Sequence, residues 1–337
     1  MMKHNSYTIA TLGSHSALQI MKGAKDEGFA TLLVSEASKV SLYRRFSFID
    51  KIISINSFSD FPRIEKQLQK YHCILIPHGS FVAYLGKEGN KKITIPYFGN
   101  KKVLDWEEDR QLQRQWLIEA NIHVPKEYSS KNISGPVIVK SYGAAGGWGY
   151  IFASDKAEFN KKIHTMKSNK YIIQQYIVGV TCYIHYFYSP LTDSLEIMSL
   201  DRRYETNADA IGRIPAINQK HLNVNPEFVV VGNSPLVLRE SLLPEAYAMG
   251  ERIVTASKKC IDKRGLIGPF CLETIITPDQ SFIAMEISCR IVAGTNLFID
   301  GSPYTALTYN EPMSTGRRIA REIKNALKKN VLDTLLD

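Results

Sequence analysis

Short apolar runs alternate with amphipathic stretches in the first part of the chain, and this alternation predicts a parallel α/β sheet. The first run is followed by Gly13-Ser14-His15-Ser16 and then by apolar residues at helical spacing, which indicates a strand, a loop and a helix. The expected strands are residues 7–12, 30–34, 51–55 and 73–76.

Two loops of this predicted sheet carry candidate binding residues. His15 follows the first strand and Ser80 follows the fourth. Because ligands collect beyond the carboxyl ends of parallel strands, both loops are expected to face one crevice, and a helix N-terminus there would favour a phosphate. The alternative is that each residue only caps a helix.

The stretch 136–153 reads as a strand, a glycine-rich loop and a second strand. Lys140 ends the first apolar run, and a loop of small residues follows it. Glycines allow backbone N–H groups to approach a polyphosphate, and the lysine adds a full charge, so we expect a flap over nucleotide phosphates; an ordinary mobile turn is the alternative. Neither a Walker loop nor a dinucleotide fingerprint is present. The flap glycines are Gly143, Gly146, Gly147 and Gly149.

Residues 171–179 form a predicted strand that leaves through a glycine, and such a linker between lobes can pair with an adenine edge. An ordinary strand end is the alternative. A hairpin pattern covers residues 180–200, and the polar cluster 201–207 that follows is either a solvated loop or part of a cleft. Helices are expected at about 105–120, 156–166 and 244–261, with an amphipathic, basic surface helix at about 315–336.

Two later strands each carry an acid within an apolar run. Glu273 and Glu286 flank the turn 277–280, so a hairpin would place them on neighbouring strands. Like charges at that distance need a cation, and carboxylate oxygens together with phosphates suit Mg²⁺. The alternative is that one glutamate pairs with Arg290 while the other faces water.

Composition narrows the class of protein. The chain has 337 residues, 44% of them hydrophobic, and its length suggests two or three lobes. No apolar run is long enough for a membrane span, no secretory signal opens the sequence, and five scattered cysteines favour reduced thiols in a cytoplasm. The formal charge of +9 is spread along the chain, so an anionic small substrate explains it as well as nucleic acid does.

The order of these features resembles the ATP-grasp ligases, and the segments GSHSALQI, IPHGS, GAAGGWGY, DRRYETNAD and MEISCRIVAGTN resemble the archaeal formate-dependent FAICAR synthetases among them. The resemblance implies a fold of mixed class, α/β and α+β: a parallel, Rossmann-like pre-ATP-grasp domain at residues 1–98 and two ATP-grasp lobes at 99–200 and 201–337, with the flap lobe at about 125–185. It also implies an ATP-dependent carbon–nitrogen ligase that formylates aminoimidazole carboxamide ribonucleotide (AICAR) through formyl phosphate, in purine synthesis.

The resemblance further implies roles for individual residues. His15, Ser80 and Asn233 would contact AICAR, Glu273 and Glu286 would hold Mg²⁺ or Mn²⁺, and Lys140 and Arg290 would offset charge on the transferred phosphoryl group. ATP would be contacted by the flap glycines, Lys140, Gln174, Gln175, Tyr176, Ile177 and Glu205. A cytoplasmic homo-oligomer without nucleic-acid or membrane partners is expected.

Three positions depart from the family pattern. Ser288 stands where many ATP-grasp enzymes have a metal-binding asparagine, and Ala145 and Trp148 stand where basic flap residues are expected. The flap positions leave open a paralogue that joins another acid to another amine. A basic protein that binds nucleotides or RNA without turnover is the non-enzyme alternative.

Overall fold

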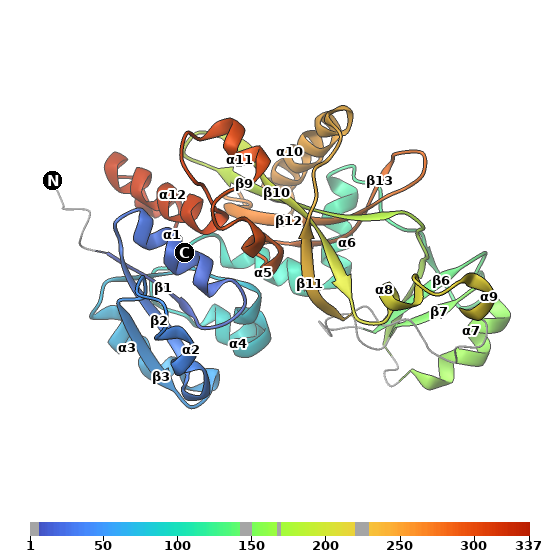
Figure 1. Ribbon diagram of the computed structural model, residues 1–337, viewed down its shortest axis with the longest axis horizontal. Helices are drawn as coiled ribbons and strands as arrows, with labels where there is room; N and C mark the ends of the chain where they lie inside the picture. The colour runs from blue at the N-terminus through green and yellow to red at the C-terminus, as the bar shows by residue number, and fades with distance from the viewer. Residues whose placement is uncertain (1–6, 142–149, 167–169, 220–228) are drawn as a thin grey trace.

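The computed structural model describes residues 7–141, 150–166, 170–219 and 229–337. Three sheets follow one another across the molecule, and Figure 1 shows the N-terminal sheet at one end and the smallest sheet at the other. No helix in the described ranges is long and apolar enough to cross a membrane.

The first sheet is parallel, with strand order β3-β2-β1-β4, as the alternating pattern predicts. Its interior strands are buried on both faces because helices cover them, which accounts for their nearly continuous apolar sequences. Its elements are β1 (Thr8–Leu12), α1 (Ala17–Asp26), β2 (Ala30–Glu36), α2 (Val40–Tyr43), β3 (Lys51–Ile55), α3 (Phe61–Gln69), β4 (Cys73–Leu75) and α4 (Gly79–Lys91).

The predicted helix at 105–120 is wrong in its boundaries, because two helices occupy this region. They are α5 (Lys101–Glu108) and α6 (Arg110–Glu119). Asp109 between them has extended backbone angles, and its carboxylate accepts the N–H groups of Gln111 and Leu112. It therefore caps α6 and ends the run of helical hydrogen bonds.

A small antiparallel sheet comes next, with order β5-β8-β6-β7. Val137 and Val139 face a core that includes Phe159 of α7 (Lys156–Lys162), so Ile138 and Lys140 lie on the opposite face of β6. The strands are β5 (Glu127–Tyr128), β6 (Val137–Ser141), β7 (Ile151–Ala153) and β8 (Tyr171–Gln175).

The largest sheet is antiparallel, with order β11-β10-β9-β12-β13. The polar cluster after residue 200 is not a loop, because β10 continues through it to Glu205. The strands are β9 (Val180–Ser189), β10 (Ser194–Glu205), β11 (Val230–Pro235), β12 (Gly268–Ile276) and β13 (Phe282–Ser288). The associated helices are α8 (Ala208–Ile211), α9 (Ala216–Gln219), α10 (Leu243–Cys260), η6 (Ala293–Phe298) and α11 (Pro303–Thr308).

The helix predicted at 315–336 is not the surface element expected. It is α12 (Thr315–Lys329), which packs along α1 and buries Arg318 and Glu322. The two helices cross closely because each has a glycine at the contact: a Cβ on Gly23 would lie 2.2 Å from the backbone nitrogen of Arg317, and one on Gly316 would lie 2.4 Å from the carbonyl oxygen of Gln19. The first and last parts of the chain are therefore packed together (Figure 1).

This crossing gives a first stability prediction. Gly23→Ala should lower the free energy of unfolding by about 3 kcal/mol, because the methyl group meets backbone atoms that can only move by separating the helices. Denaturant unfolding measures the change. Gly212→Ala is the control, since its methyl group would meet nothing closer than 3.6 Å. Equal effects in the two variants would contradict the close crossing.

Candidate nucleotide and metal site

One face of the large sheet gathers the predicted metal ligands and two further charged residues. Strand register pairs Asp201 with Tyr183, Tyr183 with Glu273, and Glu273 with Glu286, so these four side chains form a row across β10, β9, β12 and β13. Arg203 lies two residues after Asp201 on β10 and therefore shares this face.

The two predicted metal ligands lie in different electrostatic surroundings. Both oxygens of Glu273 accept hydrogen bonds from the Arg203 guanidinium, at 3.0 and 2.5 Å. Burial and the neighbouring Glu273 carboxylate raise the pKa of Glu286, against the opposing charges of Arg110 and Lys140. The two carboxylates are register partners on β12 and β13, and carboxylate oxygens are ligands that Mg²⁺ prefers. Among the described residues no group of three or more His, Cys, Asp or Glu side chains could hold a metal alone, so further ligands would have to come from substrate or water.

Lys140 reaches this face from the small sheet. Its side chain is buried, and its ammonium lies 5.7 Å from the centroid of the Tyr150 ring. Burial lowers the pKa of Lys140, while the charges of Glu286 and Glu273 act in the opposite direction. The lysine ammonium is thus within electrostatic range of both acids.

The predicted adenine linker follows β8. Gln174 is buried and its amide nitrogen donates to Glu127, while the backbone N–H groups of Gln175 and Tyr176 donate to Lys126 and Pro136. Within the described ranges the Ile177 N–H has no backbone partner, so it is one linker donor that could pair with an adenine edge.

Glu205 lies beside this linker at the end of β10. Burial and the Asp209 carboxylate raise its pKa to about 7, and its own charge acts on Tyr176. Glu205 is therefore an acid whose pKa lies near neutral pH, next to the predicted adenine site.

The raised pKa of Glu205 predicts a pH dependence of stability. Because the folded state binds the proton more tightly than the unfolded state, this group favours folding below about pH 4.5 and loses that contribution as pH rises through about 7. Glu205→Gln should therefore gain about 1 kcal/mol over the natural chain at pH 7 and nothing at pH 4.5. Urea unfolding of both proteins at the two pH values measures the difference, and a constant difference would contradict the prediction.

The two N-terminal loops meet at one place, as the sequence predicts for a parallel sheet. The rings of His15 and His78 stack with centroids 5.6 Å apart. Ser80 is buried just beyond, and its backbone N–H donates to Nδ1 of His78. Residue His78, rather than His15 or Ser80, caps a helix, so the capping alternative is wrong for both predicted residues.

His15 lies at the surface beside Arg290, since a Cβ on Gly79 would lie 3.0 Å from Nε2 of His15 and 3.2 Å from Cζ of Arg290. Its backbone has a φ of 52°, and desolvation followed by the charge of Arg290 lowers its pKa. An uncharged imidazole beside a guanidinium can accept a hydrogen bond from a substrate or donate one, and the guanidinium attracts an anion. These groups suit a phosphorylated ligand.

Asn233 is held in place by the buried carboxylate of Asp201. Its side-chain nitrogen donates to Asp201 at 2.6 Å, and Nε2 of His185 donates to the other carboxylate oxygen at 2.5 Å. Gly294 packs directly on the Asp201 carboxylate, where a Cβ would lie 2.3 Å from Oδ1. In the same 3₁₀ helix Asn296 donates to the His15 carbonyl, so η6 joins the Asn233 side of the site to the His15 side.

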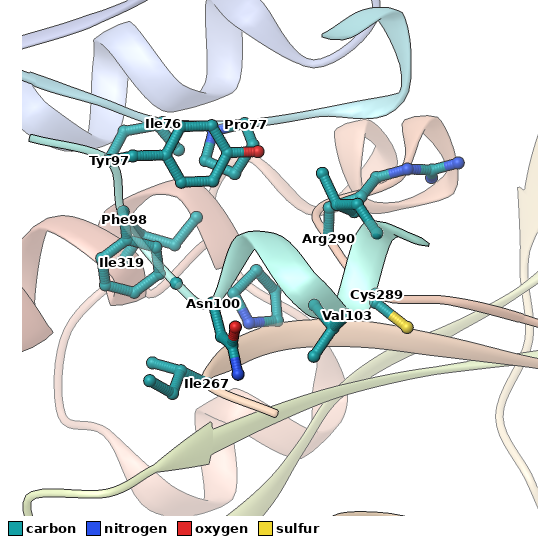
Figure 2. A pocket seen from close by; sticks show the side chains of 13 residues that line it. Ile76, Pro77, Tyr97, Phe98, Asn100, Val103, Ile267, Cys289, Arg290 and Ile319 are labelled. Carbon is teal, nitrogen blue, oxygen red and sulfur yellow. The ribbon is translucent and has the colours of Figure 1, made fainter. Parts of the chain in front are cut away.

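Arg290 does not pair with either predicted metal ligand, so that alternative is wrong. Its guanidinium pairs with Glu107 at 2.9 Å. Figure 2 shows that the Arg290 side chain extends away from the other residues that line a small cavity. This cavity has a free volume of about 10 Å³, room for about one water molecule, and Tyr97 Oη and Arg290 Nε line it without a partner in the described structure. It is too small to be a nucleotide site.

The structure brings Lys140 into electrostatic range of Glu273 and Glu286, and Arg203 joins Glu273 to the strand position opposite Asn233. It also places His15 and Arg290 together beside Gly79, next to Ser80. The glycines of the predicted flap, with Ala145 and Trp148, lie outside the described residues. Sequence reasoning missed Arg203 and Asp201 as site residues. Both stand at alternate positions of the DRRYE segment, and this period of two is the signal that could have identified them.

Solved structures identify the class of fold. The chain matches the crystal structure of an IMP biosynthesis protein PurP from Thermococcus kodakaraensis with a TM-score of 0.79 and 31% identity, over 98% of this chain and 100% of that one. It matches an ADP complex of N5-carboxyaminoimidazole ribonucleotide synthetase with a TM-score of 0.68 and 15% identity, over 95% and 78%. The fold is that of an ATP-grasp ligase.

Sequence comparison narrows this class. A 5-formaminoimidazole-4-carboxamide-1-(beta)-D-ribofuranosyl 5'-monophosphate synthetase of Pyrococcus horikoshii is 51% identical over 97% of this chain and 99% of its own length. Family models described as a domain of unknown function (DUF1297) and a protein of unknown function (DUF1246) match residues 153–337 and 9–128. The chain belongs to the family of these FAICAR synthetases.

Proposed function

We propose that this protein uses ATP to join formate to the amine of AICAR, forming FAICAR, ADP and phosphate. The observation that carries the proposal is the meeting of Lys140 from the small sheet with Glu273 and Glu286 of the large sheet, together with the adjacent His15 and Arg290 side chains. The name of the family gives the product, and these side chains supply the charged groups that its synthesis requires.

Activation of formate is the first requirement. Formate is a resonance-stabilised anion and the ring amine of AICAR is a weak nucleophile, so we propose that the γ-phosphoryl group of ATP passes to formate. The formate oxygen bonds to phosphorus, the bond to ADP breaks, and formyl phosphate forms. The amine then attacks the formyl carbon, the amine loses a proton, and phosphate leaves.

The residues act by placement and charge, since phosphoryl transfer asks little covalent chemistry of a protein. Glu273 and Glu286 would hold Mg²⁺, or Mn²⁺ in its place, and the metal would neutralise the polyphosphate. Lys140 would contact the transferred group from the small sheet, and Arg290 would offset charge from the N-terminal side.

Two further subsites follow from the geometry. Ile177 N–H would receive the adenine edge, with Glu205 beside it. The AICAR ribonucleotide would lie among His15, Ser80 and Asn233, with its phosphate in the field of Arg290. We also propose the three-part division at residues 98 and 200. The first boundary follows the strands of the parallel sheet, whereas the sheets do not support the second, because residue 200 lies inside β10 and both neighbours of β10 belong to the same sheet.

An assay with labelled formate, ATP and AICAR tests this function. Label should enter FAICAR with one ADP released for each product, and omission of formate or AICAR should stop ADP release. ADP release that needs a different acid or amine would contradict the proposal and favour a paralogue. Nucleotide binding without any turnover would overturn the assignment as an enzyme.

A further inference from the structure

Arg203 lies between the two halves of the site. Its guanidinium donates to both oxygens of Glu273 on one side, and on β11 its register partner is Asn233. The guanidinium carbon also lies 3.9 Å from the centroid of the Tyr183 ring, which limits the positions the side chain can take. The arginine therefore stands where the metal pair and the predicted AICAR subsite meet.

Two electrostatic effects support this intermediate position. The charge of Arg203 contributes to lowering the pKa of His15, after burial and after Arg290 and His78. The same charge also opposes the rise in the pKa of Glu205 that burial and Asp209 cause. A single guanidinium thus acts on residues of both predicted subsites.

The chemistry of the reaction places formate at the same point. If the proposed function holds, the formate carboxylate must lie between the phosphoryl group held near Glu273 and the amine held near Asn233. A planar guanidinium with two parallel N–H donors is the side chain best matched to a carboxylate. In the ligand-free protein those donors already hold a carboxylate, that of Glu273.

We infer that Arg203 is the formate-binding residue, and that its guanidinium exchanges the Glu273 carboxylate for the formate carboxylate when Glu273 coordinates the metal. The inference rests on the proposed function and names the formate subsite within it. In the free protein the pair offsets part of the acidic charge, and on exchange the same donors are left available to the substrate.

The other cations near the site fit this role less well. Arg290 is already paired with Glu107, which is no metal ligand and has no reason to leave. Lys140 is a point charge on the opposite sheet, beside Tyr150, and suits a phosphate better than a planar carboxylate. Arg203 alone of these three is bound to a group that metal binding would draw away.

Steady-state kinetics and direct formate binding test the inference. Arg203→Lys keeps the positive charge but loses the two parallel N–H donors of the guanidinium. The KM for formate should therefore rise at least about tenfold, while the KM for AICAR changes less than about threefold. Carbon-13 formate line broadening should show binding to the natural protein with Mg²⁺ and ADP, and at least about tenfold weaker binding without them. Arg203→Gln should show no formate binding in either condition.

Arg202→Gln is the matched control. The substitution removes the same charge one residue away, but the half-exposed side chain of Arg202 lies on the opposite face of β10. Formate kinetics and binding should stay at the natural level. If Arg203→Gln fails to fold in a thermal scan, Arg203→Lys still decides the question.

The results separate the inference from the function beneath it. Natural protein that makes no FAICAR from AICAR, formate and ATP would overturn the proposed function. Natural protein that makes FAICAR, together with an Arg203→Lys variant whose formate KM is unchanged, would overturn only the inference. An equal rise in all three KM values, or formate binding that ignores Mg²⁺ and ADP, would also overturn it.

Discussion

Replacing Glu286 with glutamine is expected to make the protein more stable and at least about 1,000-fold less active. The raised pKa of Glu286 shows that burial and the Glu273 carboxylate work against its charge in the folded state. A neutral isostere removes that cost, so we expect the free energy of unfolding to rise at pH 7. The proposed metal site would lose a charged ligand at the same time. ADP release with all three substrates and urea unfolding measure the two effects.

Glu273 is the register partner of Glu286, but Glu273→Gln should change stability in the opposite direction. The Arg203 guanidinium would lose its carboxylate partner, so stability should fall by about 2 kcal/mol, together with ATP turnover. AICAR binding should persist in both variants. Glu245→Gln, an exposed residue paired with Arg252, is the control and should change neither quantity. Turnover near the natural level in either active-site variant would contradict the metal assignment.

Glu27→Gln is expected to lower the free energy of unfolding by about 3 kcal/mol or more. The Glu27 side chain is 1% exposed and accepts hydrogen bonds from Arg317, Arg321 and Lys324 of α12. A neutral amide would leave three cations around it without their shared counter-charge. Glu311→Gln is a matched control, because Glu311 pairs with the same two arginines but is 42% exposed, and it should cost less than about 1 kcal/mol.

The same glutamate predicts an acid-labile contact. Burial opposes its charge, but hydrogen bonds from Arg321 and Arg317 outweigh this and lower the pKa of Glu27 to about 2. An acid with a depressed folded pKa stabilises fully above its unfolded value of about 4.5 and loses the contribution as pH falls toward 2. Unfolding measured from pH 6 to pH 2 should show the difference between the natural chain and Glu27→Gln shrinking across that window. A difference independent of pH would exclude the ionic origin.

The period of the hydrophobic pattern was enough to predict the parallel sheet, the acid-bearing hairpin and the long helix before residue 261. Each of these elements buries one side or both sides in a regular period, so the spacing of apolar residues identifies it. The break at Asp109 was missed because apolar residues continue at helical spacing on both sides of it. The buried face of α12 was missed because its arginines and glutamate pair with partners far away in the sequence, such as Arg318 with Glu196.

Site residues were predictable where the residue type was unusual for its strand. Glu273 and Glu286 interrupt apolar runs, and Lys140 ends one, so each stands out in the sequence. Arg203 and Asp201 were not singled out, because a dense polar segment looks the same whether it is a loop or a strand. Only the register of β10 with β9 and β11 shows which of its charges share a face with Tyr183.

The contact between α1 and α12 has a consequence for synthesis of the protein on the ribosome. Gln19 accepts a hydrogen bond from Gly316, a residue 297 positions later, and the backbone of Tyr97 pairs with that of Asp337. The contact between α1 and α12 can therefore form only after residues 315–337 have emerged from the exit tunnel. Until then the face of α1 that packs on α12 is exposed. A nascent chain arrested before residue 315 should bind a chaperone for exposed apolar surface, and one extended past residue 337 should release it.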